Sequence, residues 1–373
     1  MDTVLYSILP FVAILVALIV IHELGHYITA KMFGVKVLEA GLGYPPRMFG
    51  FTWRGTIYSF NWLPLGGFVR LLGEEDPTDP ESLAAQKAWK RMIILAAGSF
   101  MNLMLPILLF AAAYMMPRDV AVGPAVIDVV ESGSPAAVAG LQSGDQIVSL
   151  DGDEVKNSQE VGRNIRVNMG ETITFVVNRQ VADGGGFERF EADVKARWAP
   201  PSGQGPTGIQ ISNKVSSSAI CQNSNLPQCT QTERYPVWEA IPKGWTATWD
   251  SLILARNQVI QIFYGGEGPQ VAGPVGIADA TGDVVKEAGW KTLLDMAALL
   301  SINLAIINML PLPMLDGGRF AFVVLEVIRR GKRVAPEKEA IVHLVGLALI
   351  LVSALVITYF DVVRLIDGRS LFE

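Results

Sequence analysis

The stretch His22-Glu23-Leu24-Gly25-His26 ends an apolar run that covers residues 8–21. Two residues four apart on a helix lie almost above one another, so His22 and His26 can offer imidazole nitrogens to one metal ion. Glu23 is placed beside them to take a proton from an attacking water molecule. The alternative is a pair of histidines that caps a membrane helix at the interface. Because ionisable groups at membrane depth are costly and usually functional, the pattern favours a metal site.

The composition indicates a few membrane spans and a water-exposed domain. The 373 residues are 50% hydrophobic and 18% charged, with a mean hydropathy of +0.35. This is too apolar for a soluble enzyme and too charged for a bundle that lies wholly in the membrane. The net charge is -6 and there is no basic tract, so no nucleic-acid partner is expected. Cys221 and Cys229 lie far from any Cys-His set, and a position outside the cytosol would permit a disulfide between them.

Four apolar segments have the length of a membrane span, at residues 4–30, 92–116, 293–310 and 340–360. The first does not resemble a secretory signal, because Asp2 stands where basic residues are expected. Lys and Arg concentrate in residues 31–91 and 329–338, which predicts that both loops are cytoplasmic. Both termini and the segment 117–290 are then outside. His22 and His26 fall near the cytoplasmic end of the first span.

The loop after the first span is apolar and rich in strand formers. Residues 56–63 and 66–72 are predicted strands, broken by Gly and Pro turns. One interpretation is a hairpin that dips toward the metal site, whose edge could pair with an extended substrate. The other is a small cytoplasmic sheet that rests on the membrane surface.

Residues 133–152 are predicted to form a turn, a short helix, a turn, a strand and a turn, and they resemble the corresponding part of a PDZ domain. Strands at 125–130, 172–178 and 208–212 and a helix at 158–168 would complete it. PDZ domains hold a chain terminus or an extended peptide along a strand edge. The alternative is a small β-rich domain that binds no peptide and only blocks access to the metal site. Residues 236–263 are amphipathic and tryptophan-rich, which predicts a helix on the outer membrane surface.

Polar residues mark the end of the third span. Asn303 and Asn308 lie at membrane depth, and two prolines then break the helix before Asp316. A catalytic zinc site has three protein ligands, so the third ligand must be His343, a cysteine or a carboxylate. Asp316 has the expected depth, whereas Asp295 lies at the outer end of the span. The alternative for Asp316 is a carboxylate that caps a helix or turn.

In the second span, Gly98 is followed four residues later by Asn102. This spacing predicts a close helix approach with a buried amide on the same face, and helix packing alone would also account for it.

These motifs together resemble the site-2 protease family of intramembrane zinc metalloproteases, in particular its RseP-type branch. The resemblance rests on His22-Glu-x-x-His26, the PDZ-like insert and Asn308-x-x-Pro-x-Pro-x-x-Asp316-Gly. It implies one zinc ion bound by His22, His26 and Asp316, with Glu23 as the general base. The residues that it implies for substrate binding are Asn308, Asn303, Asn102, and Gly66, Gly67 and Phe68 of a membrane re-entrant hairpin.

The resemblance also implies an enzyme of the bacterial inner membrane that cleaves transmembrane segments of single-span proteins. Trimmed anti-sigma factors and signal-peptide remnants are the substrates implied. A zinc transporter and an inactive membrane scaffold with a peptide-binding PDZ domain are the rival functions. Glu23 beside a ligand fits a transporter poorly, and an inactive scaffold predicts an incomplete ligand set.

The fold class predicted is a multi-span α-helical membrane protein with four transmembrane helices, a membrane-associated β-hairpin and an inserted α+β PDZ domain. Its segments are residues 1–34 (first span), 35–91 (hairpin loop), 92–116 (second span), 117–213 (PDZ domain), 214–292 (linker and surface helices), 293–339 (third span and loop) and 340–373 (fourth span and tail).

Overall fold

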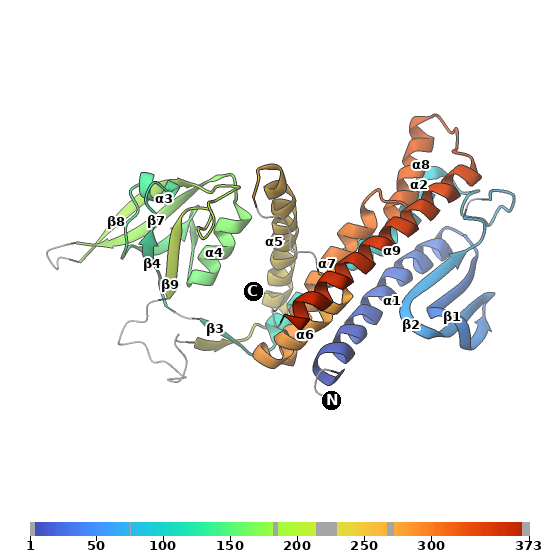
Figure 1. The fold of residues 1–373 in the computed structure, drawn as a ribbon, viewed down its shortest axis with the longest axis horizontal. Helices are drawn as coiled ribbons and strands as arrows, with labels where there is room; N and C mark the ends of the chain where they lie inside the picture. The colour runs from blue at the N-terminus through green and yellow to red at the C-terminus, as the bar shows by residue number, and fades with distance from the viewer. Residues whose placement is uncertain are drawn as a thin grey trace. The chain divides into compact units, whose positions relative to one another are not determined.

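The computed structural model describes residues 4–74, 76–121, 123–181, 186–213, 230–266 and 272–367 (Figure 1). The chain divides into two compact units. A helical unit comprises Met1–Ala113, Ile241–Thr248 and Val271–Glu373, and a β-rich unit comprises Tyr114–Ala240 and Trp249–Gln270. Cys221 and Cys229, and with them the disulfide considered above, lie outside the described residues.

Four helices of the described chain are long and apolar enough to cross a membrane, at Leu5–Met32, Ala88–Met115, Trp290–Met309 and Pro336–Ile366. They correspond to the four predicted spans. The last begins four residues before its predicted start, because hydropathy detects only the apolar part of the helix. Pro336 occupies its first turn, where proline is favoured, and Glu337 and Glu339 follow there, where acidic side chains suit the helix dipole.

Among the described residues, the helical unit contains six complete α-helices, together with Ile241–Thr248 of a further helix and a β-hairpin. A π-helical turn, Val4–Ile8, leads into the first of them. Their bounds are α1 Leu9–Met32, α2 Ala88–Met115, α6 Pro274–Ala288, α7 Leu293–Met309, α8 Asp316–Ile328 and α9 Pro336–Ile366.

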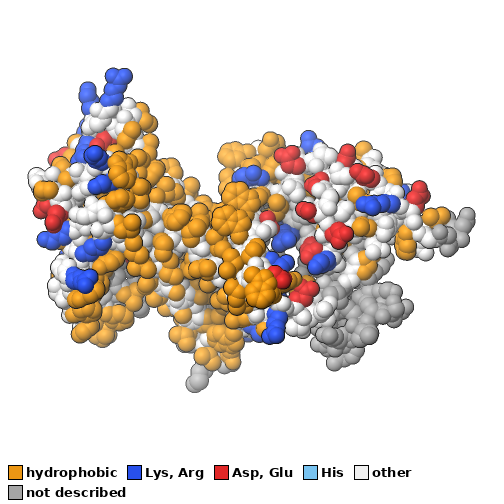
Figure 2. Space-filling view, turned by 180° about the vertical axis from the view of Figure 1, so that it is seen from behind, with side chains coloured by type: hydrophobic (Ala, Val, Ile, Leu, Met, Phe, Trp, Pro, Cys, Tyr) orange, Lys and Arg blue, Asp and Glu red, His pale blue; other side chains and the backbone are white. Residues whose placement is uncertain are grey.

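The spans differ in how much protein surrounds them. In the most apolar 18-residue stretch of each helix, 44% of the residues are buried in α2 but only 11% are buried in α9. Figure 2 shows hydrophobic side chains over most of the visible surface of the helical unit, with basic side chains gathered at one end of it. An apolar surface of this extent is typical of lipid contact.

Glycines allow α1 and α2 to pack closely. A Cβ atom on Gly25 of α1 would clash with the carbonyl oxygen of Ala97 on α2. A Cβ atom on Gly98 would clash with the Nε2 atoms of His22 and His26. The close helix approach predicted at Gly98 is therefore present, and it occurs where the motif histidines lie.

The hairpin that follows α1 consists of β1, Val37–Trp53, and β2, Thr56–Leu71. Residues 39–42 pair on one side with residues 57–60 and on the other with residues 67–70. The two strands predicted at 56–63 and 66–72 are thus one strand that bends, and Gly66 has a φ of 98° at the bend. Residues 67–71, here called the edge segment, form one edge of this small sheet.

A buried carboxylate joins the parts of the hairpin. Glu39 lies 2.8 Å from Arg47 and 3.1 Å from Arg70, which belongs to the edge segment. Burial alone would raise the pKa of Glu39, but hydrogen bonds from Ser59 and Arg47 outweigh it and hold this pKa below its ordinary value. The ion pair with Arg70 adds to the strand pairing that joins the edge segment to residues 39–42.

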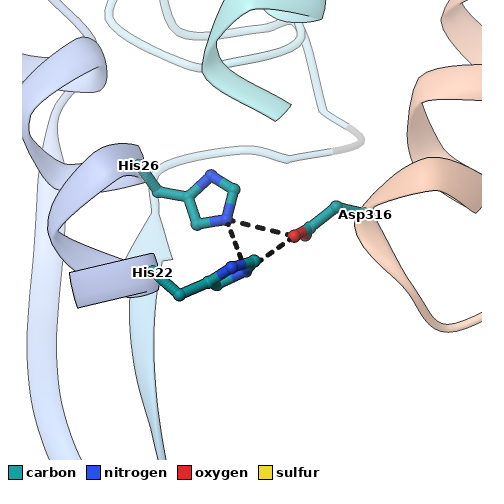
Figure 3. A group of neighbouring side chains, drawn as sticks. All are labelled: His22, His26 and Asp316. Atoms are coloured by element: carbon teal, nitrogen blue, oxygen red, sulfur yellow. Dashed lines mark hydrogen bonds and ion pairs between the residues drawn. The ribbon is translucent and has the colours of Figure 1, made fainter. Parts of the chain in front are cut away.

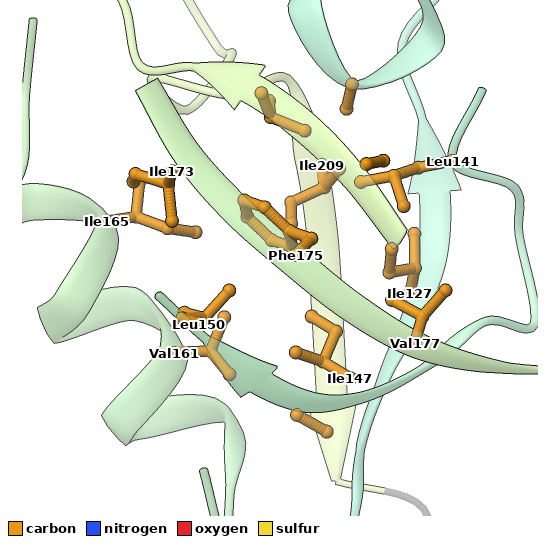
Figure 4. Packing of buried hydrophobic residues seen from close by; sticks show 14 of the residues in the cluster. Ile127, Leu141, Ile147, Leu150, Val161, Ile165, Ile173, Phe175, Val177 and Ile209 are labelled. Atoms are coloured by element: carbon orange, nitrogen blue, oxygen red, sulfur yellow. The ribbon is translucent and has the colours of Figure 1, made fainter. Parts of the chain in front are cut away.

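The β-rich unit is an antiparallel sheet with strand order β8-β7-β5-β4-β9, to which β6 adds beside β5. Aliphatic side chains and Phe175 from the strands and from α4 fill one core (Figure 4). A separate two-stranded sheet pairs β3, Arg118–Ala121, with β10, Thr230–Glu233. The bounds of the other elements are β4 Ala125–Val130, α3 Pro135–Val138, β5 Gln146–Leu150, β6 Asp153–Glu154, α4 Ser158–Val167, β7 Thr172–Gln180, β8 Phe187–Lys195, β9 Ile209–Asn213 and α5 Val237–Phe263.

A second buried carboxylate ties α9 to α6. Asp361 of α9 is only 2% exposed, and it accepts a hydrogen bond of 2.8 Å from the backbone nitrogen of Gly276. Gly276 lies in the first turn of α6, where backbone N–H groups have no partner within the helix. Arg364 donates to the same carboxylate at 3.0 Å.

We expect Asp361→Ala to destabilise the helical unit by about 2 kcal/mol, because the N–H of Gly276 and Arg364 both lose a charged partner. Thermal unfolding in detergent should show Tm lower by about 3 °C. Glu337→Ala, which removes an exposed carboxylate from the first turn of the same helix, is the matched control and should lower Tm by about 1 °C at most, because an exposed charge there contributes only about 0.3–1 kcal/mol. Equal Tm values for both variants would contradict the role of Asp361.

Candidate metal centre

Three side chains from two distant parts of the sequence converge at one point in the helical unit (Figure 3). The Nε2 atoms of His22 and His26 lie 3.2 Å apart, and Asp316 Oδ2 lies 2.9 Å from the first and 3.2 Å from the second. Among the described residues, these three are the group of metal-binding side chains whose ligand atoms gather within 4.8 Å. Two imidazole nitrogens and one carboxylate oxygen are a ligand set typical of catalytic zinc.

Helix geometry on one side and a broken helix on the other bring the three ligands together. The histidines occupy successive turns of α1. The helix α7 ends at Met309, two prolines follow, and Asp316 then begins α8. A Cβ atom on Gly317 would clash with the carbonyl oxygens of Met309 and Leu310. The glycine therefore lets the first turn of α8 fold back against the end of α7, with Asp316 at its start.

His343 supports this loop and is not part of the ligand group. Its Nδ1 atom accepts a hydrogen bond of 2.8 Å from the backbone nitrogen of Met314. Met314 has a φ of 77°, a left-handed conformation that is unusual for a side chain of this size. Of the alternatives weighed for the third ligand, the geometry thus favours Asp316.

The Nδ1 atom of His26 has a hydrogen-bond partner, which leaves the Nε2 atom available for a metal ion. His26 Nδ1 donates to the carbonyl oxygen of Ile94 on α2, at 2.8 Å. With its proton on Nδ1, the ring presents a lone pair at Nε2. Ligating histidines usually make such a bond, because it fixes both the tautomer and the ring orientation.

Asn102 lies next to the Nδ1 atom of His22, as the Ile94 carbonyl lies next to the Nδ1 atom of His26. Asn102 is 0% exposed, and its amide lies 3.3 Å from His22 Nδ1. Its Oδ1 atom has no hydrogen-bond partner among the described residues. A half-turn of the amide would let that oxygen accept the Nδ1 proton and satisfy both groups, leaving Nε2 of His22 for a metal. The residues present therefore fit a zinc ion.

Glu23 lies beside the ligand group in a polar cavity of about 340 Å³. The cavity is also lined by His26, Asp316 and the edge segment. Gly67 lies close to α1, because a Cβ atom there would stand only 3.1 Å from a methyl carbon of Ile19 and at ordinary contact distance, 3.5 Å, from Glu23 Cγ. The backbone of Val69 hydrogen-bonds to the Glu23 carboxylate. Glu23 is thus held between the candidate metal ligands and the hairpin.

The other predicted substrate-binding residues occupy varied positions. Gly67 and Phe68 line the polar cavity, whereas Gly66 forms the bend before them. Asn308 is half-buried near the end of α7, and Asn303 is exposed on the same helix. Their contacts with substrate stay predictions. Asn102 lies against His22, a candidate metal ligand, in a position that suits orientation of the imidazole ring.

One pair at the polar cavity was missed by the sequence analysis. Arg319, one turn after Asp316 on α8, forms an ion pair with Glu74, which follows the edge segment. The three-residue spacing between Asp316 and Arg319 would place both on one face of a helix, and this could have indicated Arg319 as a site residue. Nothing in the neighbouring sequence indicated that Glu74 is its partner.

Comparison with known proteins decides the family. The family model described as Peptidase family M50 matches residues 10–353. The chain belongs to peptidase family M50. This confirms the resemblance to site-2 proteases, and with it a zinc-dependent metalloprotease that is a multi-pass membrane protein.

Named relatives agree along the whole chain. The zinc metalloprotease RasP of Geobacillus kaustophilus is 27% identical over 438 residues, which cover 96% of this chain and 98% of RasP. A protein of Mesorhizobium japonicum, named provisionally as a zinc metalloprotease, is 32% identical over 364 residues, which cover 92% of this chain and 95% of that protein. A similarly named protein of Agrobacterium fabrum is 29% identical over 378 residues, with 96% of both chains covered.

Among solved structures, the PDZ domain of an SdrC-like protein from Listeria monocytogenes is 27% identical. The match covers 25% of this chain and 90% of that domain, with a TM-score of 0.20.

We expect Gly98→Ala to reduce zinc binding in this M50 protease strongly, because the added methyl group would occupy the space of both histidine Nε2 atoms. Zinc content per purified protein is the measurement. Gly162→Ala, at a helical glycine of α4 where a Cβ atom meets only the far end of Arg166, should retain full zinc content. A full zinc load in Gly98→Ala would show that the histidines do not bind zinc in this arrangement.

Asn102→Leu removes the acceptor for His22 Nδ1 and should weaken zinc binding by about 10–100-fold. Asn102→Asp keeps an acceptor of similar size and should retain most of the affinity. Competition with a chelator of known affinity measures both. If the Leu and Asp variants bind zinc equally well, Asn102 does not orient His22.

Proposed function

We propose that this M50 metalloprotease hydrolyses peptide bonds within transmembrane segments of single-span membrane proteins. The observation that carries the proposal is the position of the ligand group: His22 and His26 lie on a helix apolar and long enough to span a membrane. A protease with its metal ligands there acts on chains that reach the same depth. Trimmed anti-sigma factors and signal-peptide remnants are the substrates expected for such an enzyme.

The chain's own residues supply the proton chemistry. His22, His26 and Asp316 would hold the zinc ion, and a zinc ion there would activate water and polarise the scissile carbonyl. Glu23 takes a proton from the attacking water and later returns it to the nitrogen of the leaving amine. Its place in the polar cavity, beside His26 and Asp316, supports this role. Asn308 is proposed to donate to the oxygen that develops negative charge.

A substrate helix must become extended before it can be cut, because a helical backbone hides its carbonyl groups. The edge segment supports this step, since it lines the polar cavity and offers a strand edge beside Glu23. An extended substrate would add to this edge as a further strand. In this proposal Gly66, Gly67 and Phe68 guide the substrate backbone past the metal site.

The distribution of Lys and Arg indicates on which side of the membrane each loop lies, and the sequence motifs indicate the type of the β-rich unit. We propose that the loops 35–91 and 329–338 face the cytoplasm of a bacterial inner membrane, with both termini and the β-rich unit outside. We further propose that the β-rich unit is a PDZ domain, which binds a peptide or chain terminus and restricts access of untrimmed substrates. The exposed tryptophans of α5, Trp238, Trp245 and Trp249, support contact with the lipid headgroup layer.

Glu23→Gln should abolish cleavage of a tagged single-span reporter while zinc content stays at the wild-type level, because a neutral amide cannot take the proton. Asp316→Ala should lose both cleavage and zinc. Immunoblotting of the reporter in cells that express each form, with zinc measured on the purified proteins, gives both results. Continued cleavage by Glu23→Gln would exclude Glu23 as the general base, and cleavage only outside the reporter's membrane segment would contradict an intramembrane site.

A further inference from the structure

A second cavity, of about 350 Å³, lies beside the polar cavity of the metal centre. It lies between one face of α1 and the hairpin sheet, and it is open to the outside. Glu23, Gly67, Phe68 and Val69 line both cavities. The general base and the edge segment therefore stand between the two.

The second cavity has an apolar lining, whereas the lining of the first is polar. Val20 and Leu24 contribute aliphatic walls from α1, and Phe49, Phe51 and Phe60 contribute aromatic walls from the hairpin. All five of these side chains are exposed in the described chain. Apolar walls that face one another across a hollow are complementary to an apolar group, such as a large aliphatic or aromatic side chain.

The volume is sufficient for a side chain. A cavity of about 350 Å³ lies at the small end of the range for ligand sites and has room for a large aliphatic or aromatic side chain.

Strand geometry brings a substrate side chain to this place. Successive side chains of a strand point to opposite faces of the sheet. A substrate strand added to the edge segment would therefore direct alternate side chains to either side of that segment, and one side is the apolar cavity. The shared lining at Glu23 places that side chain next to the bond that is cut.

We propose that the apolar cavity is a specificity pocket, which receives one large aliphatic or aromatic side chain from a residue flanking the scissile bond. The inference rests on the proposed intramembrane cleavage and adds a side-chain preference to it. Small or charged residues at that position leave the walls uncovered or place a charge among them, and such substrates are cut slowly.

Val20 offers a test in both directions, because it forms the cavity wall without belonging to the ligand group. Val20→Phe narrows the cavity and Val20→Ala widens it. Ile28→Phe is the matched control, since Ile28 lies two turns further along α1, is exposed to a similar extent (42% against 45%) and does not line the cavity.

The experiment uses the full-length zinc-loaded protein in detergent with a series of single-span reporters. In each reporter the residues on either side of the cleavage site, located by mass spectrometry, are changed in turn to Ala, Leu, Phe, Trp or Asp. The wild type is expected to cut Leu and Phe reporters at least about tenfold faster than Ala or Asp reporters at one of the two positions. Val20→Phe should move the preference to Ala and Val20→Ala should move it to Trp, while Ile28→Phe keeps the wild-type order.

Two results would overturn the inference alone: Glu23-dependent cleavage without any size preference, or an equal slowing of all reporters by Val20→Phe. The second would indicate that a lipid chain or the helix packing occupies the cavity. Absence of Glu23-dependent cleavage for every reporter would contradict the proposed function itself, and the pocket assignment with it.

Discussion

The structure depends on bringing three proposed metal ligands to one point among apolar helices. His22 and His26 can meet a ligand from elsewhere only if the neighbouring helices approach closely, and side chains larger than hydrogen would prevent this. Glycine therefore stands at each contact: Gly98 of α2 faces the histidine nitrogens, and Gly317 lets α8 begin against the end of α7. At these positions a single methyl group would displace a ligand or the backbone that carries it.

Polar groups inside such a protein need partners, and here the partners also prepare the site for a metal. The Ile94 carbonyl holds the proton of His26 on the nitrogen that faces away from Asp316. Asn102 lies in the same position relative to His22, and His343 holds the strained Met314 in the loop before Asp316. Burial makes an unpaired polar group costly, so each of these contacts favours one arrangement of the ligands over its alternatives. The ligand side of the site is thus held by hydrogen bonds, and on the hairpin side a polar cavity lies beside Glu23.

The sequence predicted the parts of the site that local spacing determines. The four-residue separation of the histidines and the four apolar spans follow from helix periodicity and hydropathy, and the structure has both. Asp316 was selected by depth and by the broken helix, although 294 positions separate it from His22 and no spacing rule could connect them. Contacts made by backbone groups were beyond reach: the carbonyl of Ile94 has no signature in a sequence, and the bend that turns β2 into an edge beside Glu23 depends on tertiary pairing. Asn102 was recognised as a buried amide, but its partner could be identified only from the packing of α1 on α2.

The central claim is that zinc is bound by two imidazoles and one carboxylate from α1 and α8. X-ray absorption at the zinc edge of the purified full-length protein tests it most directly. The account predicts a first shell of nitrogen and oxygen atoms only, with outer-shell scattering from two imidazole rings, one of which disappears in His26→Ala. Sulfur in the first shell, or a spectrum that is the same in wild type, His26→Ala and Asp316→Ala, would place the metal elsewhere and contradict the account.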